Sequence, residues 1–165
     1  MENFIITLVC IALLLMGAMS LSMSALNSMS AIANAQETSE SLSRDILSTS
    51  IQCGNAVTTD SGATVTIDIE NDGKKALANY SAWDVIVRYQ DGDTVWIPYS
   101  TSTPGWTISG FFFQGGAEIY EPNILNPGET MRISVKLSPA VTDNSTNLAM
   151  VATPNGAVSE ITFGW

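Results

Sequence analysis

The stretch that decides how this chain is organised is FIITLVCIALLLMGAMSLSMSALNSMSAIANA, residues 4–35. It contains neither a charged residue nor a proline, so an α-helix can run through it without interruption. About 20 apolar residues are enough to cross a lipid bilayer, and this stretch is longer than that. Its second half mixes small residues with methionine, leucine and isoleucine. A simple membrane anchor would not need this second half.

The first interpretation of this segment is a targeting signal or an anchor. A secretory signal has basic residues before its apolar core, but here the first basic residue is Arg44, and the small residues at 33–35 lie far beyond the core. An anchor at residues 4–19 or 4–26 would be about 24–35 Å long, but anchors normally have Lys or Arg on their cytoplasmic flank. One explanation is that a basic leader has been removed and that Met1 is the processed N-terminus.

The second interpretation is a helix that packs against copies of itself. Gly, Ala and Ser recur throughout residues 16–35, and small residues let helix backbones approach closely in lipid or in a bundle. Larger apolar residues between them recur at helical spacing. We therefore expect a helix that first lies in a membrane and then packs among identical helices. The residues expected to pack in that core are Phe4, Ile5, Leu8, Ile11, Leu15, Met19, Met23, Leu26 and Ile32.

The helix is expected to end shortly after residue 50. The pattern becomes hydrophilic from residue 36, and a narrow apolar face continues as far as Ile51 in one interpretation. Gly54-Asn55 is a typical helix stop. We predict one helix from about residue 3 to about residue 51. The predicted domains are an N-terminal hydrophobic helix, residues 1–52, and a head, residues 53–165.

The head changes from helical periodicity to strict alternation. Residues 63–70, 83–89 and 131–137 alternate apolar and polar side chains, which is typical of half-buried antiparallel strands. Weaker strand patterns occupy residues 94–99, 106–113, 147–152 and 159–165. About seven short strands separated by Asn, Asp, Gly and Pro turns predict a β-sandwich of immunoglobulin-like type. The predicted fold class is therefore α+β: a long N-terminal hydrophobic α-helix followed by an immunoglobulin-like antiparallel β-sandwich.

Composition argues against catalysis and against nucleic-acid binding. The chain has 16 acidic and 6 basic residues, a net charge of −10 and no histidine. Such an acidic chain repels phosphate backbones, and without histidine it lacks the commonest general base and zinc ligand. Acidic residues at 60–72 and 91–93 have the oxygen ligands that calcium takes, but their spacing fits no EF-hand loop. We interpret them as solvated turn residues and expect no enzyme activity, no cofactor and no metal.

Two further sets of residues are candidate surface sites. Asn79 and Asn144 begin Asn-x-Ser/Thr sequons in predicted loops, where a glycan would face solvent. Phe111, Phe112 and Phe113 are adjacent, and neighbouring strand residues point to opposite faces, so they cannot all enter one core. They are a candidate head interface with the helix or a neighbouring subunit. The alternative is a bulged strand with phenylalanine in the head's own core and one residue exposed.

Four sequence pieces occur together and in order. They are the apolar helix, IENDGKKAL at residues 69–77 followed by WDVIVRY, ILNPGETMRISVKL at residues 124–137, and NLAMVATPNGAVSEITF at residues 147–163. In this combination the chain resembles archaellins and the related small archaellum pilin-like proteins. Bacterial type IV pilins usually have Glu at mature position five, whereas this chain has Ile5, which favours the archaellin-like branch.

The resemblance implies a type IV pilin-like helix with an immunoglobulin-like head, cleavage by a prepilin-type peptidase and residence in the cytoplasmic membrane. Assembly machinery would then extract the chain into a helical homopolymer with the helices as its core. We expect an extracellular, archaellum-like filament subunit whose role is motility, with adhesion as the alternative role. The alternative is a single-span, membrane-anchored β-sandwich protein, either an accessory protein such as an archaellum stator or a binding module.

Overall fold

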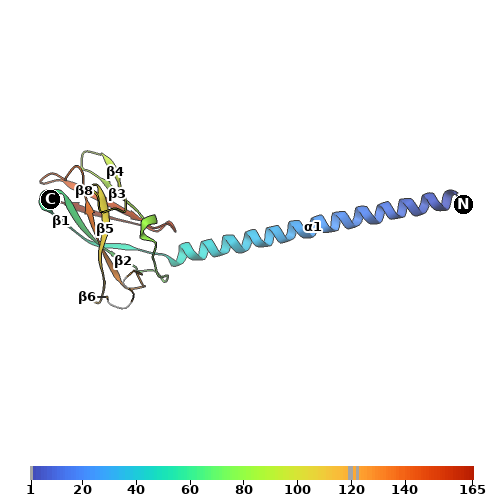
Figure 1. The fold of residues 1–165 in the computed structure, drawn as a ribbon, viewed down its shortest axis with the longest axis horizontal. Coiled ribbons are helices and arrows are strands. Elements are labelled where there is room, and N and C mark those ends of the chain that lie inside the picture. Colours follow the sequence, from blue (N-terminus) through green and yellow to red (C-terminus); the bar gives the residue numbers. More distant parts are fainter. Residues whose placement is uncertain (1, 119–120, 122) are drawn as a thin grey trace. The chain divides into compact units, whose positions relative to one another are not determined.

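A long helix precedes a β-sandwich head, as the sequence predicts (Figure 1). The computed structural model describes residues 2–118, 121 and 123–165, so Met1, the proposed processed N-terminus, lies outside the described residues. Helix α1 spans Glu2–Ser48. The chain divides into two units between Arg44 and Asp45, and the last residues of α1 therefore belong to the head unit. The domain boundary at residues 52/53 stays a prediction.

The helix ends earlier than predicted, and for a tertiary reason. The carbonyl of Ser48 accepts a hydrogen bond from the backbone N–H of Lys74 at 2.8 Å, so the head takes over one of the carbonyls that a helix end leaves free. Ile51, which one interpretation placed on the helix, lies outside it and is buried in the head core. Gly54-Asn55 is not a helix stop, since it lies at a bulge within strand β1 (Gln52–Thr59).

The head consists of two antiparallel sheets. We call them the first sheet, ordered β1-β2-β7-β5-β6, and the second sheet, ordered β4-β3-β8-β9. The remaining elements are η1 (Asp60–Gly62), β2 (Thr64–Glu70), η2 (Tyr80–Ala82), β3 (Asp84–Arg88), β4 (Thr94–Ile97), β5 (Gly105–Phe113), β6 (Gly116–Ala117), β7 (Thr130–Lys136), β8 (Thr146–Ala152) and β9 (Val158–Gly164). The predicted strands are confirmed within a few residues, whereas β1 and β6 were not predicted.

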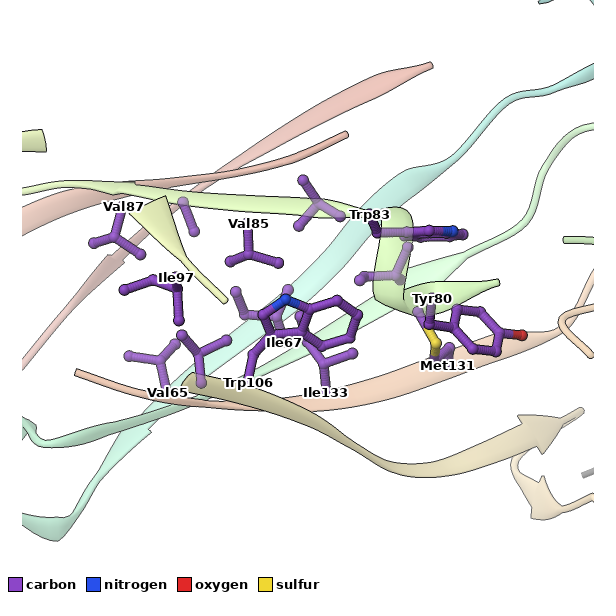
Figure 2. Close-up of a cluster of buried hydrophobic side chains, with 14 of the residues drawn as sticks. Val65, Ile67, Tyr80, Trp83, Val85, Val87, Ile97, Trp106, Met131 and Ile133 are labelled. Atoms are coloured by element: carbon purple, nitrogen blue, oxygen red, sulfur yellow. The ribbon is translucent and has the colours of Figure 1, made fainter. Parts of the chain in front are cut away.

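The core forms where the alternating residues of the two sheets meet. In the register of β2 with β7, Ile67 lies opposite Ile133, and both side chains are fully buried. Trp106 of β5 is 1% exposed. Figure 2 shows its ring among these two isoleucines of the first sheet and Val85 and Ile97 of the second. Strand alternation thus gives the head an internal core that is independent of any partner.

Candidate assembly surfaces

The predicted packing residues of helix α1 are all exposed in the single chain. Among the nine, the exposed fraction runs from 53% at Ile11 to 75% at Met19. These nine positions are only part of the exposed apolar surface, because α1 is apolar on every side of its first half. The large apolar residues that it left out are equally exposed: Ile6, Val9, Leu13, Leu14, Met16, Leu21 and Met29.

This exposed apolar surface is too large to remain in water. Burying one such side chain contributes about 1.5–3 kcal/mol, so covering about five of them matches the entire stability of a typical domain, about 5–15 kcal/mol. By length and composition, residues Phe4–Ser48 form a helix able to cross a membrane. The helix therefore requires a lipid or protein environment over its apolar part.

Polar side chains of the helix are compatible with such an environment. Ser28 donates from its hydroxyl to the carbonyl of Ser24 at 2.9 Å, and Thr38 does the same to Asn34 at 2.9 Å. Hydroxyls bonded back to the preceding turn do not leave an unsatisfied donor facing an apolar neighbour. The first charged residue after Phe4 is Glu37, so the uncharged part of the helix is about 50 Å long at 1.5 Å per residue.

The last turn of the helix is bonded to the loop that follows β2. The ammonium group of Lys75 lies 2.8 Å from a carboxylate oxygen of Asp45, and the backbone N–H of Lys74 caps Ser48. A cation beside the C-terminal end of a helix also interacts favourably with the helix dipole. These bonds explain why residues from Asp45 onward belong to the head unit.

Asn71 holds that loop in shape. It is fully buried, and its amide donates to the carbonyls of Lys75 and Leu125, both at 2.8 Å. Its side-chain oxygen accepts from the backbone N–H of Gly73 at 3.1 Å. A Cβ at Gly73 would lie 2.6 Å from the backbone nitrogen of Ser50, so only glycine lets the loop approach the chain just after the helix this closely.

A bulge in β5 distributes the three phenylalanines among different environments. Phe111 turns inward and is buried in the head's own core. Phe112 is half-buried beneath the guanidinium of Arg132, 4.8 Å from the ring centre, and Phe113 is 49% exposed. Phe111 is therefore unavailable to a partner, and the candidate interface narrows to Phe112 and Phe113.

Both sequon asparagines are exposed on the head, in the loops predicted for them. Asn79 directly precedes η2 and Asn144 lies between β7 and β8. Both have left-handed backbone angles, with φ of 56° and 58°, which asparagine tolerates better than most residues. Their glycosylation stays a prediction.

Two ionisable groups of the head, the Cys53 thiol and the Arg132 guanidinium, have pKa values that are shifted by burial or by hydrogen bonding. Burial raises the pKa of the Cys53 thiol, and a hydrogen bond with Ser159 offsets part of that rise, so the thiolate that reacts is disfavoured. Arg132 binds Asp68 through two nitrogens, at 2.6 and 2.9 Å, and this pairing raises the pKa of the guanidinium. Among residues 2–118, 121 and 123–165, no group of three His, Cys, Asp or Glu side chains is placed to hold a metal ion.

Several solved structures have the same fold as this chain. The archaellum periplasmic stator protein FlaG from Sulfolobus acidocaldarius is 26% identical, with a TM-score of 0.57 over 70% of this chain and 99% of that chain. A complex of FlaF and FlaG from the same organism gives 25% identity and a TM-score of 0.56, over 68% of this chain and 87% of that chain. The archaeal flagellum of Methanospirillum hungatei strain JF1 is 11% identical, with a TM-score of 0.65 over 96% of this chain and 90% of that chain.

The matched structures differ in how much of this chain they cover. A match over 96% of the chain includes most of helix α1 as well as the head, whereas a match over 70% leaves out a stretch about as long as that helix. No protein of curated function matches the chain. The sequence model of archaeal-type flagellin matches residues 5–163, from the first turns of the helix to the last strand. The chain therefore belongs to the archaeal-type flagellin family, whose members are structural filament subunits.

Proposed function

We propose that this chain is a structural subunit that polymerises into an extracellular, archaellum-like filament for motility. Before assembly, helix α1 lies in the cytoplasmic membrane, where a prepilin-type peptidase and the archaellum assembly machinery act on the chain. After assembly, helices from many copies form the filament core. The observation that supports this proposal is the exposed apolar surface of α1 between Phe4 and Ile32, in a chain of the archaeal-type flagellin family.

The energetics of this transfer determine what holds the filament together. Lipid tails are as apolar as leucine, so moving the helix from lipid to neighbouring helices gives little net hydrophobic gain. Close packing must supply the stability instead, and the small residues between 16 and 35 allow the backbones to approach. Extraction from the membrane therefore needs energy from the assembly machinery.

The acidic head suits the outside of such a polymer. The charged residues of the chain lie outside positions 4–36, so the core stays free of ions while the surface is strongly negative. A net negative charge keeps assembled and unassembled heads soluble. A helical polymer whose core excludes water requires that the packed segment, here residues 4–36, carry no charged side chain.

The test is to shear the surface of cells that express the chain and to examine the sheared fraction by electron microscopy and mass spectrometry. We expect filaments in which this chain is the dominant protein. Recovery of the chain only as single copies in the membrane fraction would contradict the proposal. Intact mass of the purified chain would report any leader removal and glycosylation of Asn79 or Asn144 in the same sample.

The second candidate function is that of an accessory protein of the archaellum, anchored in the membrane by a single span with its head outside the cell. The observation in its favour is the 26% identity to FlaG, which exceeds the 11% identity to the flagellum of Methanospirillum hungatei. In this role α1 would remain a single membrane span and the head would bind a partner. Abundance separates the candidates, because an accessory protein would be a minor component absent from sheared filaments.

A further inference from the structure

The outer faces of the two sheets differ in character. On the first sheet, the outward residues of β2 and β7 are polar throughout: Thr64, Thr66, Asp68, Glu70, Thr130, Arg132, Ser134 and Lys136. Polar residues are usual where one face of an antiparallel sheet meets water. Strands β2 and β7 therefore present no apolar surface to a partner on their outer side, and the candidate interface at Phe112 and Phe113 lies on the neighbouring strand β5.

The outer face of the second sheet carries a cluster of apolar side chains across neighbouring strands, with Asp84, Arg88 and Glu160 around it. In the strand register, Ile86 of β3 lies between Trp96 of β4 and Met150 of β8. Trp96 is 57% exposed and Val158 of β9 is 52% exposed, while the remaining members are half-buried. We call this surface the apolar face; its members are Ile86, Trp96, Leu148, Met150, Ala152 and Val158.

An open hollow with a cation lies at one end of the apolar face. It has a volume of about 430 Å³, and its lining includes Arg88, Gln90, Leu148 and Thr162. Arg88 is exposed and makes no ion pair with any residue in the described part of the chain. The face therefore combines an apolar surface with an unpaired guanidinium beside a concave site.

We propose that the apolar face is a contact between the heads of neighbouring copies of this chain, in which Arg88 pairs with a carboxylate of the neighbour. This inference rests on the proposed filament function and names the head surface through which the copies meet. In a helical polymer such a contact is heterologous, so the apolar face of one copy meets a different surface of the next.

Charge identifies a second copy as the occupant. Heads of a chain with 16 acidic and 6 basic residues repel one another when brought side by side. The outer face of the second sheet has few charges, since it holds one cation, Arg88, and two acids, Asp84 and Glu160, at other positions of the sheet. One carboxylate oxygen of Asp84 already accepts a hydrogen bond from the Trp96 indole at 2.9 Å. Copies can therefore approach here with little repulsion, and the acidic neighbour provides the carboxylate that Arg88 lacks.

The test uses the full chain in cells that assemble it, with two variants at exposed positions. Arg88→Glu reverses the charge beside the hollow, and Lys136→Glu is its matched control on the outer face of the first sheet. Trp96→Lys places a charge on the apolar face, and Thr66→Lys is its control. We expect each apolar-face variant to lower the filament mass in the sheared fraction at least tenfold, with controls near wild type and an unchanged thermal midpoint of the head in detergent.

Site-specific cross-linking tests the same contact with a different readout, the identity of the molecule that lies next to the apolar face in the filament. A benzophenone amino acid is introduced in the substitution Trp96→benzoylphenylalanine, with Thr66→benzoylphenylalanine as the control. Irradiation of filaments should join two copies of this chain through position 96 and not through position 66. Cross-links from position 96 to a different protein, or none, would overturn the inference, as would normal filaments from both apolar-face variants.

The outcomes separate this inference from the proposed function. If wild-type cells produce filaments of this chain but the variants assemble normally, only the head contact is wrong. If wild-type cells produce no filament of this chain, the proposed function fails, and the head contact fails with it.

Discussion

The helix and the head contain similar kinds of apolar residues but use them in opposite ways. In the head, alternation places Ile67, Ile133 and Val85 between two sheets, where each is fully buried. In the helix, a continuous apolar run leaves residues such as Leu15 63% exposed. The head therefore gains its stability within one chain, whereas the helix gains it only from lipid or from other copies. Substitutions in the two regions should accordingly have effects on different measurements.

The largest effect on folding is expected at the centre of the head core. Trp106→Ala should lower the free energy of unfolding of the head by about 3–5 kcal/mol, the usual cost of a large aromatic residue in a core. Its indole nitrogen has no hydrogen-bond partner in the described part of the chain, so the loss is one of packing. Denaturant unfolding of the full chain in detergent measures it. A loss below about 1 kcal/mol would mean that the core collapses around the cavity.

The converse effect is expected in the helix. Leu15→Asp should leave unfolding of the head unchanged but abolish filament formation. A carboxylate near the centre of a membrane span costs about 2.5–3.5 kcal/mol in insertion, and every copy in a filament core would bring one more charge. Sheared filament yield and head unfolding are measured on the same variant, with Leu15→Met as the volume-conserving control. Normal filaments from Leu15→Asp would place that side chain outside the core.

An intermediate effect is expected in the loop that meets the end of the helix. Asn71→Ala removes the donor for the Lys75 carbonyl and the acceptor for the Gly73 N–H, and one of the two donors to the Leu125 carbonyl, which keeps its bond from the Leu77 N–H. It should destabilise the head by about 2–3 kcal/mol, because unsatisfied buried groups cost about 1–3 kcal/mol each. The control is Asn155→Ala, whose side chain makes a single hydrogen bond of 3.2 Å to Thr49. Equal losses in the two variants would show that Asn71 contributes no more than an ordinary hydrogen bond.

Strand alternation and the uncharged N-terminal run made most of this architecture predictable. Residues 63–70 and 131–137 alternate strictly, and they became β2 and β7 at the centre of the first sheet. The helix was predictable because no proline or charge interrupts residues 4–35. In both cases the local pattern and the tertiary environment favour the same structure.

The features that the local sequence pattern did not predict, strand β1 and the bulge in β5, depend on pairing between strands. Strand β1 contains Gly54-Asn55 and lacks alternation, and only its pairing with β2 makes it a strand. The bulge in β5 shifts the register by one residue, which turns Phe111 to the core instead of Phe112. Neither the pairing nor the bulge has a local signal in the sequence.

The apolar face could have been predicted from the sequence, because two of its strands have apolar residues at outward as well as inward positions. Val85-Ile86-Val87 and residues 148–152 are nearly continuous apolar runs, a pattern typical of strands covered on both faces. The alternating pattern accounts for the inward residues of these strands but not for the apolar outward residues Ile86 and Met150. The nine helix positions chosen as packing residues have the same limitation, since the side chains between them are equally exposed.

The smallest effect tests where the head unit begins. Lys75→Ala removes the ion pair with Asp45, whose side chains are 42% and 52% exposed, and should lower the unfolding free energy of the head by about 0.5 kcal/mol, as partly exposed ion pairs do. The effect should shrink at 1 M salt, because screening then acts over about 3 Å. Arg44→Ala is the control, since its pair with Glu40 lies before the division of the chain and is 3.6 Å long and highly exposed. A loss at Lys75 but not at Arg44 means that the last turn of α1 unfolds together with the head. Equal losses would mean that the segment unfolding together with the head extends along α1 at least to Arg44. The change from a head stabilised within one chain to a helix stabilised by its surroundings would then be gradual along α1.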